Sequence, residues 1–406
     1  MKQISGGVTA AAGFLASGIH CGIRKNQSKK DLALIFSEKR AAAAAIYTQN
    51  IVKGAPLIVT AENISDGFAQ AIICNSGNAN TCNENGIEIA KETCTLVASA
   101  LSIAPTDVIV ASTGVIGQPL DITPIKNGIP ALVASLRPDE EGSADAASAI
   151  MTTDLKAKET AVSFTLGGVL CHMGGIAKGS GMINPNMATM LVFITTDVAI
   201  SPEMLRLALS RDVADSFNMI SIDGDTSTND MVTVMANGMA GNAMITAPGD
   251  DFDVFCKALA TITRSLSRMI AADGEGATKL LVCRVSGALD CENARRIAKS
   301  VICSNLVKAA MFGADANWGR VLCAIGYSGA KVDVSKISVS FSSSAGTVNV
   351  CSGGFGIPFS EEDAKKILSQ PEININIGLG DGVASAEAWG CDLTYDYVKI
   401  NGDYRT

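Results

Sequence analysis

Two kinds of apolar segment alternate along this chain, and the alternation limits the fold more than any other feature. One kind is short and bounded by turn residues, as buried strands are, and the other places apolar residues at helical spacing. The strand-like segments are 57–61, 71–74, 108–111, 162–166 and 279–285, and the long helix-like segments are 87–103, 252–270 and 293–311. We therefore predict a mixed α/β fold, with a larger α/β core over residues 1–280 and a smaller C-terminal α/β domain over 281–406.

Local signals fix the ends of several elements. Ser201 precedes Pro202 and Glu203, which predicts a helix that begins with a serine cap and a proline in its first turn. Ser360 opens a further helix, which stops before Pro371. The segment 373–377 alternates isoleucine with asparagine, as a half-buried strand does.

Charge and hydropathy exclude two broad classes. Lys plus Arg number 32 against 40 Asp plus Glu, a net charge of −8 over 406 residues, so the basic face typical of nucleic-acid binding is not expected. Residues 3–23 carry no charge, but glycines interrupt them, and we interpret them as a strand and a turn of the fold rather than a signal peptide. No segment reaches ~18 consecutive apolar residues, and we expect a cytoplasmic location.

Histidine and cysteine usage argues against metal chemistry. His20 and His172 are the only histidines, so one chain cannot supply a three-histidine metal site, and a histidine-based triad would need one of these two. The 12 cysteines form no C-x-x-C pair. We interpret most of them, including Cys74, Cys283 and Cys323, as reduced residues of the core, and we predict no metal site.

Familiar motifs are missing. The chain has no G-x-x-x-x-G-K-[ST], no H-E-x-x-H and no G-x-S-x-G. The segment 223–229 resembles the start of a calcium loop, but Thr228 replaces the required glycine and Val234 the bidentate acid. An Asx-rich turn that caps the next element is the better interpretation.

The segment 178–197 is the most unusual part of the sequence. Its glycines and an Asn-Pro-Asn turn lead directly into an apolar strand, with Ala188 and Thr189 at the junction. If the Ala188–Thr189 bond is cut, Thr189 gains a free α-amine, with a reference pKa of about 7.7–8.0, beside its hydroxyl. One residue would then supply both nucleophile and base. A threonine that merely starts a strand is the alternative reading of the same residues.

Eight motifs together resemble one known family. They are GGVTA at 6–10, NSGNAN at 75–80, STGVIG at 112–117, MTTD at 151–154, KGSGMINPNMATML at 178–191, IDGDTSTND at 222–230, GEGATK at 274–279 and GADANWGR at 313–320. On these motifs the whole chain resembles the ornithine acetyltransferase family, the bifunctional glutamate N-acetyltransferases of arginine biosynthesis. The segments TAAAGF at 9–14 and DLKAKE after MTTD depart from the family pattern, and neither touches a catalytic position.

The resemblance implies a self-processed enzyme. Cleavage between Ala188 and Thr189 would give an α chain 1–188 and a β chain 189–406, and Thr189 would be the nucleophile that takes the acetyl group. Thr113 and Gly114 match the family's oxyanion hole. The implied fold is a layered α/β sandwich that resembles the N-terminal-nucleophile hydrolases, and the implied assembly is an α₂β₂ heterotetramer.

The resemblance also implies the ligand contacts and the reaction. The contacts map to Thr152, Lys178, Thr189, Glu275, Asn401 and Thr406, and the choice between Thr152 and Thr153 stays open. Lys178 would meet the substrate carboxylate and Glu275 its positive amine. The implied reaction moves the acetyl group of N²-acetyl-L-ornithine to L-glutamate without a cofactor. Whether acetyl-CoA also serves as a donor is left open.

Two alternatives remain at this point. A self-processing aminopeptidase or amidase would share the threonine nucleophile and hydrolyse its substrate. A non-catalytic acidic α/β binding protein would use Thr189 only to start a strand. Replacement of Thr189 by alanine separates the binding protein from both enzymes, because a binding protein should keep its ligand affinity and an intact chain in both forms.

Overall fold

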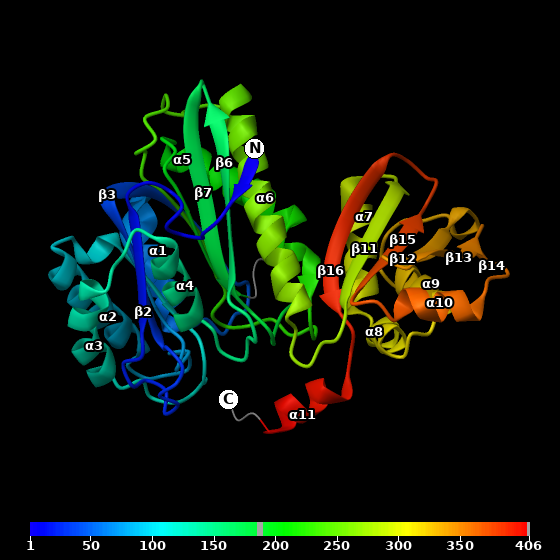
Figure 1. Cartoon of the computed structure of the whole chain (residues 1–406), viewed down its shortest axis with the longest axis horizontal. Coiled ribbons are helices and arrows are strands. Elements are labelled where there is room, and N and C mark those ends of the chain that lie inside the picture. Colours follow the sequence, from blue (N-terminus) through cyan, green and yellow to red (C-terminus); the bar gives the residue numbers. More distant parts are fainter. Residues whose placement is uncertain (185–189, 404–406) are drawn as a thin grey trace.

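The structure is a computed structural model that describes residues 1–184 and 190–403. In this part of the chain the strands form two sheets, one of nine strands and one of seven. The long helix α6 (Asp250–Ala272) lies between the two sheets, and the C-terminal helix α11 (Tyr395–Asp403) lies below them (Figure 1). The predicted mixed α/β class is confirmed.

The first sheet has the order β1-β6-β7-β8-β10-β3-β4-β5, with β2 paired to β3. Its β8–β10 and β4–β5 pairs are parallel and its other pairs antiparallel. The strands are β1 (Lys2–Ile4), β2 (Phe14–Ile19), β3 (Leu32–Tyr47), β4 (Phe68–Asn75), β5 (Val108–Ser112), β6 (Lys158–Leu166), β7 (Val169–Lys178), β8 (Leu191–Thr196) and β10 (Met231–Ala236).

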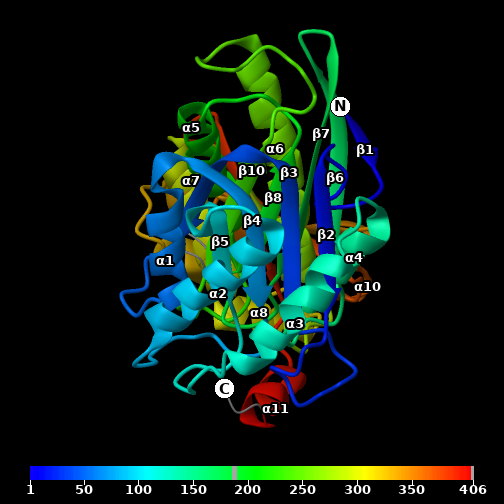
Figure 2. The same cartoon turned by 90° about the vertical axis from the view of Figure 1, so that its left-hand side faces the viewer.

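Helices cover both faces of this sheet. In Figure 2, α2 (Gly86–Leu101), α3 (Thr123–Ala134) and α4 (Glu140–Ala149) lie in front of its strands. The opposite side is packed by α5 (Pro202–Asp212) and α6, which also contact each other. The sheet is therefore buried over most of its area, as its continuous apolar strands require.

The second sheet has the order β14-β13-β12-β15-β11-β16-β9. Its strands are β9 (Ile220–Ser221), β11 (Leu280–Ala288), β12 (Ser338–Ser343), β13 (Gly346–Ser352), β14 (Phe355–Gly356), β15 (Glu372–Gly378) and β16 (Ala384–Cys391). Its helices are α7 (Cys291–Cys303), α8 (Asn305–Phe312), α9 (Trp318–Gly326) and α10 (Glu361–Leu368). The division of the chain near residue 280 stays a prediction, since β9 precedes that point and joins this sheet.

The amphipathic pattern of α6 explains its central place. Phe252, Phe255, Leu259, Ile262 and Leu266 are all at most 1% exposed and belong to one core cluster that includes side chains of both sheets. A helix with such a continuous apolar stripe must bury it. The predicted start of α5 is also confirmed, because Ser201 Oγ accepts a hydrogen bond from Met204 N at 3.3 Å.

Three local predictions are wrong. Residues 57–61 belong to the helix α1 (Ala55–Asn63), because Gly54 and Pro56 form its start and its buried apolar run fits either structure. The helix predicted over 293–311 is two helices, separated at Ser304, whose Oγ caps α8 by accepting from Val307 N at 3.3 Å. Cys323 is exposed, and only six of the 12 cysteines are buried.

Among the described residues, no helix is long and apolar enough to cross a membrane.

Candidate active site

The parallel strands β4 and β5 continue past their ends as two paired loops. Thr113 N donates to Asn75 O at 2.9 Å, and Ala79 N donates to Val115 O at 2.9 Å. Between them Gly114 has a φ of 124°, and a Cβ there would lie 2.7 Å from the carbonyl carbon of Gly77. Only glycine fits this close approach of two backbones.

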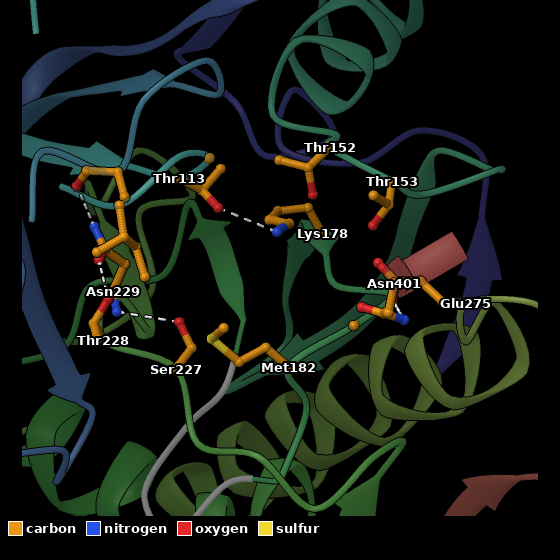
Figure 3. A pocket seen from close by; sticks show the side chains of 14 residues that line it. Thr113, Thr152, Thr153, Lys178, Met182, Ser227, Thr228, Asn229, Glu275 and Asn401 are labelled. Atoms are coloured by element: carbon orange, nitrogen blue, oxygen red, sulfur yellow. Dashed lines mark hydrogen bonds between the residues drawn. The ribbon is translucent and has the colours of Figure 1, made fainter. Parts of the chain in front are cut away.

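Thr113 and Gly114 present different groups to the pocket beside these loops. The Thr113 N–H is already bonded, so its hydroxyl is the free group, and that oxygen accepts a hydrogen bond from Lys178 Nζ at 3.2 Å (Figure 3). No acceptor for the Gly114 N–H is found among the described residues. One hydroxyl and one N–H group thus lie next to each other just after the C-terminal end of β5. An oxyanion hole needs two such donors side by side.

Lys178 is the buried cation of the pocket. It ends β7 and is 9% exposed. Burial lowers its pKa, while the negative charges of Asp154 and Asp230 act in the opposite direction. An ammonium in this setting is held ready for a carboxylate group.

Glu275 supplies the carboxylate that lines the same pocket. Its backbone N–H donates to Ser180 O at 2.8 Å, and its Oε2 accepts from Asn401 Nδ2 at 2.8 Å. Its carboxylate packs directly on Gly181, where a Cβ would lie 2.6 Å from Oε1. The glycine is thus required by the position of Glu275, and α11 brings Asn401 to it from the end of the chain.

Two threonines of the MTTD motif face the same space. Thr152 and Thr153 both line the pocket, and Figure 3 shows both side chains near Lys178. Thr152 N donates to Asp154 Oδ2 at 3.0 Å, which fixes the turn. Both threonines therefore belong to the lining of the pocket.

The third wall comes from Ser227, Thr228 and Asn229, which the sequence analysis interpreted as part of an Asx-rich turn and not as site residues. Asn229 is 5% exposed, and its Nδ2 donates to Ala79 O at 2.6 Å and to Ser112 O at 2.9 Å. Its Oδ1 accepts from the hydroxyls of Thr81 and Thr228. All four hydrogen-bonding positions of one amide are used to join three segments of the site.

The turn before this wall is organised by Asp223. Its carboxylate accepts from Met182 N at 2.6 Å, Ile183 N at 2.9 Å and Asp225 N at 3.2 Å. Burial raises the pKa of Asp223, and these three N–H groups counter the effect. The interpretation of 223–229 as an Asx-rich turn agrees with these bonds, and the described residues contain no group of three or more His, Cys, Asp or Glu placed to hold a metal ion.

Six of the predicted site residues line one pocket. They are Thr113, Gly114, Thr152, Lys178, Glu275 and Asn401. Ala188, Thr189 and Thr406 lie outside the described residues. Neither histidine lines this pocket: His20 Nδ1 bonds Lys29 O at 2.9 Å, and His172 Nδ1 bonds Asp197 Oδ2 at 2.8 Å.

The described walls of this pocket offer a lysine, a carboxylate, hydroxyls and a backbone N–H group. A cation and an anion in the lining of one pocket suit a small zwitterionic substrate, and the paired donors after β5 suit an acyl group. The fold and the site therefore define an acyl-transfer enzyme for amino-acid-like molecules.

Comparison with known proteins makes this assignment specific. A model of the ArgJ family matches residues 15–406, and the chain belongs to that family. The arginine biosynthesis bifunctional protein ArgJ of Caldanaerobacter subterraneus subsp. tengcongensis is 50% identical over 407 residues, with 100% of both chains covered. The ArgJ of Bacillus subtilis strain 168 is 47% identical, covering 100% of this chain and 98% of its own.

A solved structure agrees. The arginine biosynthesis bifunctional protein ArgJ from Bacillus halodurans is 46% identical, with a TM-score of 0.51, over 53% of this chain and 100% of its own. The family resemblance, the mixed α/β fold and the predicted class, an acetyltransferase of arginine biosynthesis, are thereby confirmed.

Proposed function

We propose that this chain moves the acetyl group of N²-acetyl-L-ornithine to L-glutamate through an acetyl ester on Thr189. The observation that carries the proposal is one pocket that gathers Thr113, Lys178, Glu275 and Asn401 from distant parts of the chain. Lys178 begins the motif that contains Thr189. Recognition groups and nucleophile are thus joined by one short segment.

The reaction has two balanced halves. Thr189 Oγ attacks the acetyl carbonyl while the free α-amine of Thr189 takes the hydroxyl proton, and the negative oxygen is stabilised by Thr113 Oγ1–H and Gly114 N–H. The C–N bond breaks, and the ornithine amine leaves with that proton. The amine of glutamate then attacks the ester, the C–O bond breaks, and the Thr189 hydroxyl is restored.

The charges of the pocket orient both substrates. Lys178 meets the α-carboxylate that acetylornithine and glutamate share, as a compact ammonium would. Glu275, held by Asn401 Nδ2 at 2.8 Å, receives the positive amine of the ornithine side chain. Thr152 or Thr153, and Thr406 from the end of the chain, complete the contacts.

Self-cleavage between Ala188 and Thr189 supplies the free amine. Residues 189–406 make up just over half of the chain. The solved ArgJ chain of Bacillus halodurans covers 53% of this chain along its full length, which is the share expected of a separate β chain. The α and β chains then form an α₂β₂ heterotetramer in the cytoplasm, with no cofactor, and acetyl-CoA is a candidate second donor.

The test is the intact mass of the purified protein beside Thr189→Ala, with Thr165→Ala as a control on an exposed strand position. We expect two chains, ending at Ala188 and beginning at Thr189, in the wild type and the control, and one uncut chain in Thr189→Ala. Acetyl transfer from acetylornithine to glutamate should follow cleavage. An uncut wild type, or peptide hydrolysis in place of transfer, would overturn the proposal.

A further inference from the structure

A buried cluster of charges lies directly behind the pocket and takes no part in lining it. Its centre is Lys158 at the start of β6, which is only 1% exposed. Lys158 Nζ lies 2.7 Å from Asp154 Oδ1 and 2.7 Å from Asp273 Oδ2. Buried charges persist only when they are paired, so the cluster must be kept for a structural or functional reason.

One carboxylate of the cluster holds two walls of the pocket. Asp154 Oδ2 accepts from Thr152 N at 3.0 Å, and Asp154 Oδ1 accepts from Gly179 N at 2.7 Å. Gly179 follows Lys178 in the chain. Asp154 therefore fixes the threonine wall and the backbone next to Lys178 relative to each other.

The second carboxylate extends the same frame towards Glu275. Asp273 Oδ2 accepts from Leu155 N at 3.1 Å and Lys156 N at 3.3 Å, and Asp273 O accepts from Ser180 Oγ at 2.9 Å. Ser180 O in turn accepts from Glu275 N at 2.8 Å. The segments that carry Thr152, Lys178 and Glu275 are thus linked through this one cluster.

The cluster also sets the electrostatics of Lys178. Burial lowers the pKa of Lys178, Asp154 and Asp230 oppose this, Lys158 lowers the pKa further, and Cys74 in β4 opposes it again. Burial alone would raise the pKa of Asp154, but the charges of Lys178 and Lys158 bring it down to about 2. Asp154 is therefore ionised, and it is the foremost opposing charge for Lys178.

We propose that Asp154 is a positioning residue that keeps Lys178 charged and in place for the carboxylate of the amino-acid substrate. The positive charge of Lys158 partly offsets the effect of Asp154 on the charge of Lys178. Asp154 does not line the pocket, and its effect on substrate binding comes through Lys178 and the backbone of Thr152 and Gly179. The inference deepens the proposed function and rests on it, because it assumes that Lys178 binds the substrate carboxylate.

The first test is the pH dependence of the KM for glutamate in Asp154→Asn. The amide keeps the shape of the side chain but removes its charge, so Lys178 loses its proton at lower pH. We expect the KM to rise at lower pH than in the wild type, by about tenfold at the alkaline end, and kcat to change less than the KM.

The second test uses a change of opposite sign. Lys158→Met removes the positive charge that lowers the pKa of Lys178, so the rise of the KM should move to higher pH. A purely structural role of the cluster would not move the two variants in opposite directions. If Lys158→Met does not fold, the comparison of Asp154→Asn with its control still decides.

The control is Asp197→Asn. Asp197 is 1% exposed and accepts from His172 N at 2.7 Å, His172 Nδ1 at 2.8 Å and Ala12 N at 3.2 Å, and it lines no part of the pocket. It should leave the KM profile unchanged. A KM profile of Asp154→Asn that matches the wild-type profile would overturn the inference. An equally large shift of the profile in Asp197→Asn would also overturn it.

A readout without turnover separates this inference from the proposed function. Calorimetry of ornithine binding in two buffers of different ionisation enthalpy reports proton uptake, which should be larger for Asp154→Asn than for the wild type at alkaline pH. Equal uptake would overturn the role of Asp154. Failure of the wild type to transfer acetyl groups would overturn only the proposed function.

Discussion

Lys178 Nζ donates a hydrogen bond to Thr113 Oγ1 at 3.2 Å, across the space between β7 and the loop after β5. An ammonium group has no lone pair to accept with, so the hydroxyl hydrogen of Thr113 must be directed away from Lys178. The Thr113 N–H is bonded to Asn75 O at 2.9 Å and is not available. The group with which Thr113 can donate to a ligand in the pocket is therefore its hydroxyl.

Thr113→Val should remove that donor and keep the shape of the side chain. We expect kcat for acetyl transfer to fall about 100- to 1,000-fold, with a smaller change in KM. Thr113→Ser keeps the hydroxyl and should retain most of the activity. Steady-state kinetics of both variants give the answer, and a valine variant with wild-type kcat would show that Thr113 stabilises nothing in the transition state.

Gly181→Ala should displace Glu275. The added methyl group would lie 2.6 Å from Glu275 Oε1, so the carboxylate must move away from Asn401. We expect the KM for acetylornithine to rise about tenfold or more, since a charged hydrogen-bonding partner is misplaced.

Gly326→Ala is the matched control for that change. It is the same substitution at a glycine of α9 where an added Cβ would meet no atom within 4 Å. Its KM should equal that of the wild type, and the thermal midpoints of both variants should be compared. Equal KM values for the two variants would mean that Glu275 does not bind the substrate amine.

The sequence predicted those elements whose signals are local. Ser201 and Pro202 mark the start of α5, and the apolar stripe of 252–270 marks the buried face of α6. The same rules failed at 57–61, because a short apolar run looks alike in a buried strand and a buried helix. They also failed at Ser304, where a single capping residue separates α7 from α8 and no proline or glycine marks the break.

The motifs predicted the pocket residues, but the roles of the groups that support these residues were not predicted. Lys178, Glu275 and Asn401 come from segments far apart in sequence, and only the fold brings them together. Asn229 and Asp154 bind backbone groups of distant loops, and such contacts leave no periodic trace. The available signals were the motifs that contain Asp154 and Asn229, and the charge of Lys158 at the start of a buried strand.

Asp212 makes stability depend on pH in a direction unusual for a carboxylate. Burial raises its pKa to about 6, above the ordinary 3.8, so the folded state holds a proton that the unfolded state releases. The contribution of Asp212 to stability is therefore greatest below 3.8, the pKa of the unfolded state, and is lost as the pH rises through 6. Asp212→Asn should raise the free energy of unfolding at pH 8 by about 1–3 kcal/mol, with a much smaller gain near pH 4.

Urea unfolding at the two pH values measures this difference. The control is Asp403→Asn, the same change at an exposed position near the end of the described chain, which should alter stability by less than about 0.5 kcal/mol at either pH. A gain for Asp212→Asn that is equal at both pH values would contradict the role of the Asp212 proton.

Met182 lies on the floor of the pocket in a conformation that favours glycine. Its φ is 56°, and Asp223 holds its N–H at 2.6 Å, so the turn is fixed although the residue is strained. Figure 3 shows its thioether between Ser227 and Glu275. In the proposed function, the methylene groups of the ornithine side chain would pack against it. We therefore expect the Met182 side chain to form an apolar wall for the substrate, a role for which backbone strain is tolerated.

Met182→Gly distinguishes a role of the Met182 side chain in the pocket wall from a role of its backbone in the turn. Glycine relieves the left-handed backbone but frees the unfolded chain, so the free energy of unfolding should stay within about 1 kcal/mol of the wild type. The KM for acetylornithine should rise about tenfold, because about two buried methylene contacts are lost, while Met182→Leu should restore most of it. Ala314→Gly is the matched control, since Ala314 has a φ of 52° and lines no part of the pocket. If both glycine variants leave the KM unchanged, Met182 contributes only to the conformation of the turn. The methylene groups of the ornithine side chain must then bind elsewhere in the pocket.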